Sequence, residues 1–190
     1  MERFRTELKA FVDALYEGEK KALVFGEGDE GARVMMIGEA PGEQETLLGR
    51  PFVGKAGKNL DQFLETAGMD RWQLYVTNTV KFRPTRLSPA GRVVNRPPTQ
   101  EEVQLFLPWL RKEIELVDPA CIITLGNVPL KALMGRRAVI GELHGAFTAA
   151  EGRRIYPMYH PASLIYNPAL KAVYREDIVR FAEWWRQNAR

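Results

Sequence analysis

VMMIGEAPGEQE, residues 34–45, is the segment around which the predicted fold is arranged. Its first four residues are apolar and indicate a buried strand. A polar loop rich in glycine, proline and glutamate follows as far as Gly54, and a helical pattern begins near Ala56. In an open α/β sheet, ligands bind in the loops beyond the carboxyl ends of the strands. The order of strand, loop and helix therefore predicts a ligand site at 38–54.

Three further apolar segments, at 72–77, 121–125 and 154–159, also predict strands, and helical patterns alternate with them. Such alternation is typical of a parallel sheet with helices on both faces. We therefore expect a three-layer α/β/α sandwich whose central sheet is mostly parallel and four-stranded. In this prediction residues 1–190 form one domain, with an N-terminal helical extension at 1–22. The prolines and glycine between 82 and 98 predict an irregular loop there.

Composition limits the class of protein. No apolar run approaches the roughly 18–20 residues of a membrane helix, and the charged N-terminus lacks a signal-peptide core, so we expect a cytoplasmic protein without membrane contact. The single cysteine, Cys121, excludes an intrachain disulfide, and its apolar neighbours predict that it fills the core. With one cysteine and two histidines, no metal site is expected.

Positive charge is concentrated in one segment. The net charge is only +3, but five cations and no acidic residue lie between 81 and 96 (Lys81, Arg83, Arg86, Arg92 and Arg96). Such a run suits a polyanion, and the alternative is a solvated loop.

Three motifs carry a resemblance to a known family. GEAPGEQE at 38–45 with GRPFVGKAG at 49–57, VTNTVK at 76–81 and HPAS at 160–163 occur in that order. With them the chain resembles the uracil-DNA glycosylases, specifically those of family 4, from about Phe25 to Ala172. The resemblance implies a monomeric DNA repair enzyme that flips uracil out of single- or double-stranded DNA. It would hydrolyse the N-glycosidic bond and leave free uracil and an abasic site.

The resemblance also implies the residues that hold uracil. Phe52 is expected to stack on the base. Asn78 offers a donor and an acceptor that match the N3–H and O4 edge of uracil. His160 is expected to stabilise the negative charge that grows on O2 as the base departs. Glu45 would close the pocket near C5, where thymine carries its methyl group.

The water that attacks the sugar is less directly indicated. Better-known members of the superfamily carry an aspartate where this chain has Ala40. We therefore expect Glu39 and the backbone of Gly42 to position or polarise the water, while Glu43 faces solvent. Little general-base strength is needed if the transition state is mostly a dissociated oxocarbenium ion.

Contacts with DNA are expected from two segments. Lys81, Arg83 and Arg86 would bind phosphates without regard to sequence. Ser163 and the backbone after His160 would contact a further phosphate. Leu164 is the expected wedge that fills the vacated stack, and Ile165 is a close competitor.

The chain departs from the family pattern at the iron–sulfur cluster, which family 4 enzymes bind with four cysteines. Phe82 and Phe106 occupy the third and fourth of these positions, and the first two fall near Phe11 and Ala14. Without thiolates no such cluster is expected, and so no cofactor. Phe11, Phe82 and Phe106 would instead form an apolar cluster. The insertion at 85–97 contains no histidine, which predicts turnover rather than covalent trapping of the product.

Three alternatives remain open. The pocket could bind damaged DNA without cleaving it, or it could act on another deaminated base such as hypoxanthine or xanthine. The GEAPG loop could also cradle a phosphate, although three nearby glutamates repel one. His144, the second histidine, is expected to be structural or at the surface.

Overall fold

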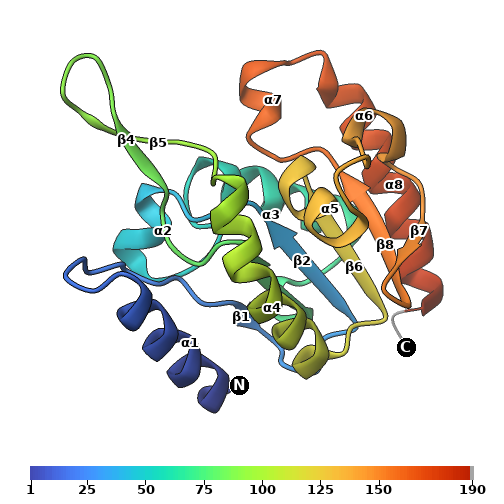
Figure 1. The fold of residues 1–190 in the computed structure, drawn as a ribbon. Coiled ribbons are helices and arrows are strands. Elements are labelled where there is room, and N and C mark those ends of the chain that lie inside the picture. Colours follow the sequence, from blue (N-terminus) through green and yellow to red (C-terminus); the bar gives the residue numbers. More distant parts are fainter. Residues whose placement is uncertain (189–190) are drawn as a thin grey trace.

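The structure, a computed structural model, describes residues 1–188 (Figure 1). Its central six-stranded sheet has the order β1-β3-β2-β6-β8-β7. The four middle strands are parallel: β3 (Leu74–Asn78), β2 (Val34–Gly38), β6 (Cys121–Leu125) and β8 (Arg153–Met158). Two short antiparallel strands, β1 (Glu27–Gly28) and β7 (Thr148–Ala150), add the edges. The expected parallel core is thus confirmed, and the sheet has two more strands than the apolar runs indicated.

Helices cover both faces of the sheet. The α-helices of the described chain are α1 (Glu2–Leu15), α2 (Glu43–Leu48), α3 (Lys55–Ala67), α4 (Gln100–Val117), α5 (Asn127–Met134), α6 (Ile140–Leu143), α7 (Ser163–Tyr166) and α8 (Leu170–Asn188), and a short 3₁₀ helix, η1, spans Arg71–Gln73. The apolar residues of α3 and α8 pack on one face, and those of α4 and α5 pack on the other. Within residues 1–188, no helix is long and apolar enough to cross a membrane.

The middle strands read as continuous apolar runs because helices cover them on both sides. Every residue of β2, β3 and β6 is buried. Along β2, Val34 and Met36 contact the α3 and α8 layer, while Met35 and Ile37 contact the α4 and α5 layer. This three-layer arrangement confirms the predicted fold class, and it places the carboxyl ends of β3, β2, β6 and β8 along one edge of the sheet.

Helix α1 closes an apolar cluster next to the sheet. Its Phe4, Leu8 and Val12 pack with Phe82 and Phe106, whose ring centroids lie 5.7 Å apart in an edge-to-face arrangement. Phe11 borders this cluster and lies 5.3 Å from the ring of Trp109. The expected meeting of Phe11, Phe82 and Phe106 is therefore confirmed.

The prediction of an irregular loop at 82–98 is wrong. Strands β4 (Thr85–Leu87) and β5 (Val93–Asn95) form a two-stranded antiparallel sheet, which projects from the body of the protein (Figure 1). We call residues 85–95 the hairpin. The prolines of the segment lie outside its two strands, so none of them removes a hydrogen bond from the ladder. Gly91 closes the turn with a φ of 72°, a conformation that favours glycine.

Candidate active site

A cavity of about 500 Å³ lies at the carboxyl ends of the parallel strands. It is lined by the loop after β2, the start of α2, residues 52–56, the tip of β3, the end of β5 and the segment after β8. Phe52, Asn78 and His160 all line this cavity. The structure thus brings to one place three side chains that the sequence placed in three separate motifs, at the edge of the sheet where α/β proteins bind ligands.

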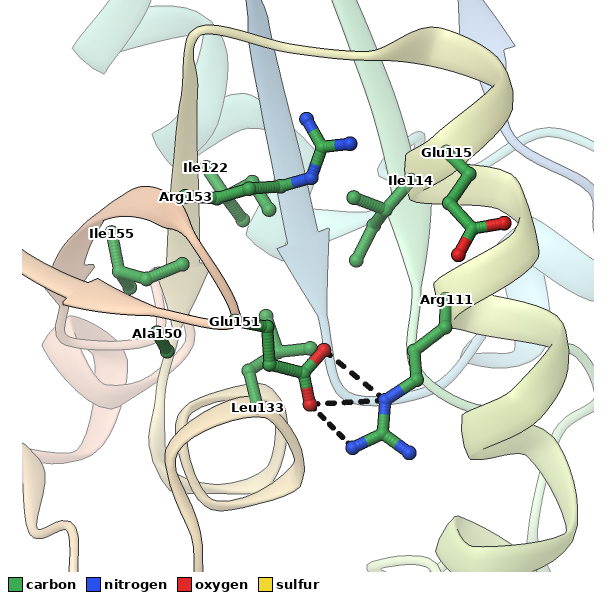
Figure 2. Close-up of a pocket in the computed structure, with 9 residues that line it drawn as sticks. All are labelled: Arg111, Ile114, Glu115, Ile122, Leu133, Ala150, Glu151, Arg153 and Ile155. Carbon is green, nitrogen blue, oxygen red and sulfur yellow. Dashed lines mark hydrogen bonds and ion pairs between the residues drawn. The ribbon is translucent and has the colours of Figure 1, made fainter.

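A smaller cavity of about 180 Å³ lies near the opposite ends of the strands, between α4, α5 and the turn that joins β7 to β8 (Figure 2). Ile122, Leu133 and Ile155 form much of its wall. Two of its four charged side chains pair with each other, since Nε of Arg111 lies 3.0 and 3.1 Å from the two carboxylate oxygens of Glu151. The lining of this cavity contains none of the predicted site residues.

Phe52 forms one wall of the larger cavity and is held in an unusual backbone conformation. Its φ is 52°, in the left-handed region that non-glycine residues seldom adopt. Arg71 holds this conformation by donating a hydrogen bond of 3.1 Å from Nη1 to the Phe52 carbonyl. A Cβ atom at Gly57 would lie 2.0 Å from that carbonyl oxygen, so glycine is required there. The ring is only 5% exposed and also contacts the core, which fixes its plane.

Asn78 ends β3 beside this ring. A Cβ atom at Gly38 would lie 2.5 Å from both Oδ1 of Asn78 and Cζ of Phe52. Glycine at the end of β2 therefore lets the amide and the ring approach the same point. No group within residues 1–188 hydrogen-bonds the Asn78 side chain, which lines the cavity and keeps its donor and acceptor for a ligand.

Lys81 lies beneath Asn78 and corrects one prediction. Its side chain is fully buried, and Nζ donates to Glu113 Oε2 at 2.5 Å, to Thr77 Oγ1 at 2.6 Å and to the Asn78 carbonyl at 2.6 Å. The expected contact between Lys81 and DNA phosphate is wrong, because all three ammonium protons are used inside the core. Glu113 also accepts a hydrogen bond of 2.9 Å from the Tyr75 hydroxyl. This network fixes the backbone that carries Asn78.

Glu45 joins the two halves of the first motif. Its carboxylate accepts hydrogen bonds from the backbone N–H groups of Gly42 at 3.2 Å, Val53 at 3.1 Å and Gly54 at 2.8 Å. A Cβ atom at Gly42 would lie 2.7 Å from Glu45 Oε2 and would displace this carboxylate. The Gly42 carbonyl accepts from both the N–H and the hydroxyl of Thr46. The backbone of Gly42 is thus engaged within the loop.

Glu39 directly follows β2 and lies beside the cavity, without being among the residues that line it. Its carbonyl accepts a hydrogen bond of 3.1 Å from the N–H of Val80, which ties the loops after β2 and β3 together. Burial raises the pKa of the Glu39 carboxyl above its usual value. Glu43, in contrast, is exposed at the rim, as expected.

His160 follows β8 and faces Phe52, with the two ring centroids 6.1 Å apart. Its Nδ1 accepts a hydrogen bond of 3.1 Å from the N–H of Ala162, so Nδ1 carries no proton. Burial lowers the pKa of His160 to about 4, against a weaker opposing effect of Glu45. The imidazole is therefore neutral at pH 7 and carries its proton on Nε2. Its charge and tautomer could not be predicted from the sequence.

The remaining predicted DNA contacts differ in exposure. Arg86 is exposed, whereas Arg83 is half-buried and donates to Asn95 Oδ1 at 2.6 Å and to Glu43 Oε1 at 3.2 Å. Ser163 is half-buried at the start of α7. Arg83 therefore connects the hairpin to α2 and has fewer protons left for phosphate.

The two candidates for the wedge are separated by the structure. Leu164 packs against the core cluster and does not line the cavity, whereas Ile165 is 48% exposed and does. Two other lining residues, Asn95 and Tyr166, had no predicted role. Asn95 reaches the cavity only through the hairpin, and Tyr166, 86% exposed, has no motif that marks it. A single sequence contains no signal for either.

Other polar and sulfur-containing groups have structural roles. His144 Nδ1 lies 2.9 Å from Oδ2 of the buried Asp177, and its ring packs on Tyr159, which confirms the structural role expected for it. Cys121 is buried in β6, and burial raises the pKa of its thiol to about 12. Its expected place in the core is thus confirmed.

The iron–sulfur cluster of the family does not fit the residues present. The positions of two of its cysteines are held by Phe82 and Phe106, whose rings pack against each other, and Cys121 lies in the sheet. Among residues 1–188, no group of three or more His, Cys, Asp or Glu side chains is arranged to hold a metal ion. We therefore derive no chemical step through such a cluster.

Comparisons with known proteins agree with this geometry. The profile of the uracil DNA glycosylase superfamily matches residues 25–186. A Type-4 uracil-DNA glycosylase of Sulfurisphaera tokodaii is 37% identical over 172 residues, 84% of this chain and 73% of that protein. One of Pyrobaculum aerophilum is 39% identical over 170 residues, 85% of this chain and 83% of that protein. The crystal structure of SMUG2 from Pedobacter heparinus shares the fold, with a TM-score of 0.54, 14% identity, and coverage of 99% of this chain and 85% of that one. This chain therefore belongs to the uracil-DNA glycosylase superfamily and, within it, to the Type-4 family.

Proposed function

We propose that this protein is a DNA repair glycosylase that removes uracil from DNA by hydrolysis of the N-glycosidic bond. The observation that carries the proposal is the convergence of Phe52, Asn78 and His160 on one cavity of about 500 Å³. The similarity to relatives that are named Type-4 uracil-DNA glycosylases supports the same conclusion. The cavity is complete within a single chain, so we propose that the protein acts as a monomer.

Base recognition follows from the two side chains that face each other across Gly38. Flipping a nucleotide costs a few kcal/mol, and stacking on an aromatic ring returns about 1–3 kcal/mol of that. Phe52 supplies the ring. The free amide of Asn78 then pairs with the N3–H and O4 of uracil, whereas cytosine presents the reversed pattern and leaves buried polar groups unpaired. Glu45 holds the loop that closes the pocket on the C5 side.

Departure of the base leaves negative charge on uracil O2. A preorganised donor lowers the barrier most when it is aimed at the atom where charge develops. His160 offers Nε2–H for this purpose, because Nδ1 is already an acceptor for Ala162. The neutral imidazole keeps its proton on Nε2, and it adds no positive charge to the pocket before the base enters.

We assign the positioning of the attacking water to Glu39. It is a partly buried carboxylate next to the cavity, and burial raises the pKa of its carboxyl group, which makes the ionised form a better proton acceptor than an exposed carboxylate. The backbone of Gly42 supports the site indirectly, because the absence of a side chain there leaves Glu45 in place. Arg86, Ser163 and, with its remaining protons, Arg83 are proposed to bind the phosphates around the everted nucleotide.

The direct test is cleavage of an oligonucleotide that contains one uracil. After incubation with the protein and alkali, strand scission at the uracil position is expected, together with release of free uracil. Tight binding without scission would instead favour a binder of damaged DNA. Parallel substrates with hypoxanthine or xanthine decide between uracil and the other deaminated bases.

Substituting Asn78→Asp is expected to reduce uracil excision by about 10⁴-fold or to move selectivity toward cytosine. The carboxylate can still accept from N3–H, but it has no proton to donate and presents a second acceptor oxygen to O4, so uracil loses its match. The measurement is kcat/KM on oligonucleotides with uracil or cytosine at one position. Asn188→Asp, the same change at the end of α8 and away from the cavity, is the matched control. Unchanged uracil removal by Asn78→Asp would refute the base-reading role.

A second prediction concerns pH. The pKa of His160 is about 4 in the folded protein, against 6.5 for a free histidine, so only the unfolded chain takes up this proton between those values. The free energy of unfolding therefore decreases as the pH falls from 6.5 toward 4, by about 3 kcal/mol from this group alone. The difference in unfolding free energy between wild type and His160→Gln isolates this contribution. An imidazole titration near 6.5 for His160, measured by NMR, would contradict the assignment.

A further inference from the structure

The hairpin presents an exposed apolar pair. Leu87 and Val93 are cross-strand partners and are 68% and 57% exposed. Side chains directly opposite in an antiparallel pair lie on the same face, and so do residues two apart along one strand. Thr85, Leu87, Val93 and Asn95 therefore share one face. Arg86 lies on the other face.

The hairpin face that carries Leu87 and Val93, which we call its apolar face, extends to the active-site cavity. Asn95 lies on it and lines the cavity. Val93 stands two residues further along β5, roughly 7 Å from Asn95. The pair is thus placed next to the base-binding pocket and outside it. Figure 1 shows the hairpin projecting at the same end of the sheet as α7, which lines the cavity with Ile165 and Tyr166.

The base of the hairpin is anchored at two points. Arg83 joins Asn95 to Glu43 at the start of α2. On the other side, Arg96 binds Glu102 of α4 with hydrogen bonds of 2.7 and 2.6 Å. Arg96 also donates from Nε to the Thr85 carbonyl at 3.1 Å. These contacts fix the direction of the hairpin relative to the cavity, so its apolar face is held in position before DNA binds.

We propose that Leu87 and Val93 pack against the face of an unpaired base that flanks the everted deoxyuridine. This inference rests on the proposed function, because the everted nucleotide brings its neighbour to this place. Two aliphatic side chains can pack on the apolar face of a base, but they provide neither positive charge nor a hydrogen-bond donor for a phosphate. In duplex DNA the faces of neighbouring bases are covered by stacking, so the partner is an unstacked base of a single-stranded segment. Arg86 and Arg92, both exposed, supply the charge that attracts the backbone on either side.

The test uses the variant Leu87→Thr/Val93→Thr, which places a β-branched residue at both positions and so keeps strand propensity while removing most of the apolar contact. The probe is a single-stranded oligonucleotide with 2-aminopurine next to a 2′-fluorinated deoxyuridine, which slows cleavage by disfavouring the oxocarbenium-like transition state. Wild type is expected to change the 2-aminopurine fluorescence on binding. The variant is expected to lose most of that change and to bind about tenfold more weakly, because the burial of two aliphatic side chains against the base is lost.

Leu116→Thr/Val179→Thr is the matched control, since both residues are exposed and lie on α4 and α8 outside the cavity. The same fluorescence change and affinity in wild type and the hairpin variant would overturn the proposal, as would wild-type protein that binds no DNA. A sedimentation coefficient that falls only in the hairpin variant would also overturn it, because the pair would then contact a second copy. Fluorescence loss in the variant, with no uracil release by wild type, would sustain the contact and refute the proposed function.

Discussion

Replacement of His160 by alanine is expected to lower the kcat of uracil excision by about 10²–10³-fold, the usual effect of removing one preorganised donor to a developing anion. Binding of DNA should change much less, because the donor acts mainly when charge appears on O2. Single-turnover cleavage with excess enzyme measures this step apart from product release.

His144→Ala serves as the control for this prediction. His144 lies outside the cavity and bonds the buried Asp177, so its loss should reduce stability and leave kcat near the wild-type value. Assays are therefore made below the unfolding temperature of both variants. Near-normal cleavage by His160→Ala would remove this residue from the mechanism.

Replacement of Lys81 by methionine is expected to lower the free energy of unfolding by about 3–5 kcal/mol, because it leaves Glu113 as an uncompensated buried charge. The ammonium group makes hydrogen bonds of 2.5–2.6 Å to Glu113, Thr77 and the Asn78 carbonyl, and methionine replaces none of them. Denaturant unfolding measures the loss. Uracil excision should also fall, since the backbone of Asn78 loses its support.

The double variant Lys81→Met/Glu113→Gln separates charge burial from packing. The neutral amide keeps an oxygen that can accept from Tyr75, and no buried charge remains unpaired. Most of the lost stability should therefore return. If the single variant is as stable as wild type, or if the double variant is less stable than the single one, Lys81 and Glu113 do not act as a buried ion pair.

Much of the fold was accessible without coordinates. The strands β2, β3 and β6 are buried on both faces, so each is a run of mainly apolar residues that can be recognised locally. A ligand site is expected in the loops after such strands. The three sequence motifs identified Phe52, Asn78 and His160 as residues of that site. The edge strands β1 and β7 were missed because each has only two or three residues and neither is buried.

Local pattern determined which segments are strands, which faces are apolar and which loops could hold a ligand. Position in space decided the rest, because it depends on partners that are distant in the chain. In the sequence Lys81 is the first cation of a basic segment, but its contact with Glu113, 32 residues away, makes it a buried support for Asn78. The hairpin depends on pairing between 85–87 and 93–95, and the tautomer of His160 depends on where the N–H of Ala162 points. The exposure and the protonation state of a side chain depend on the groups packed around it, and these groups come together only when the chain has folded.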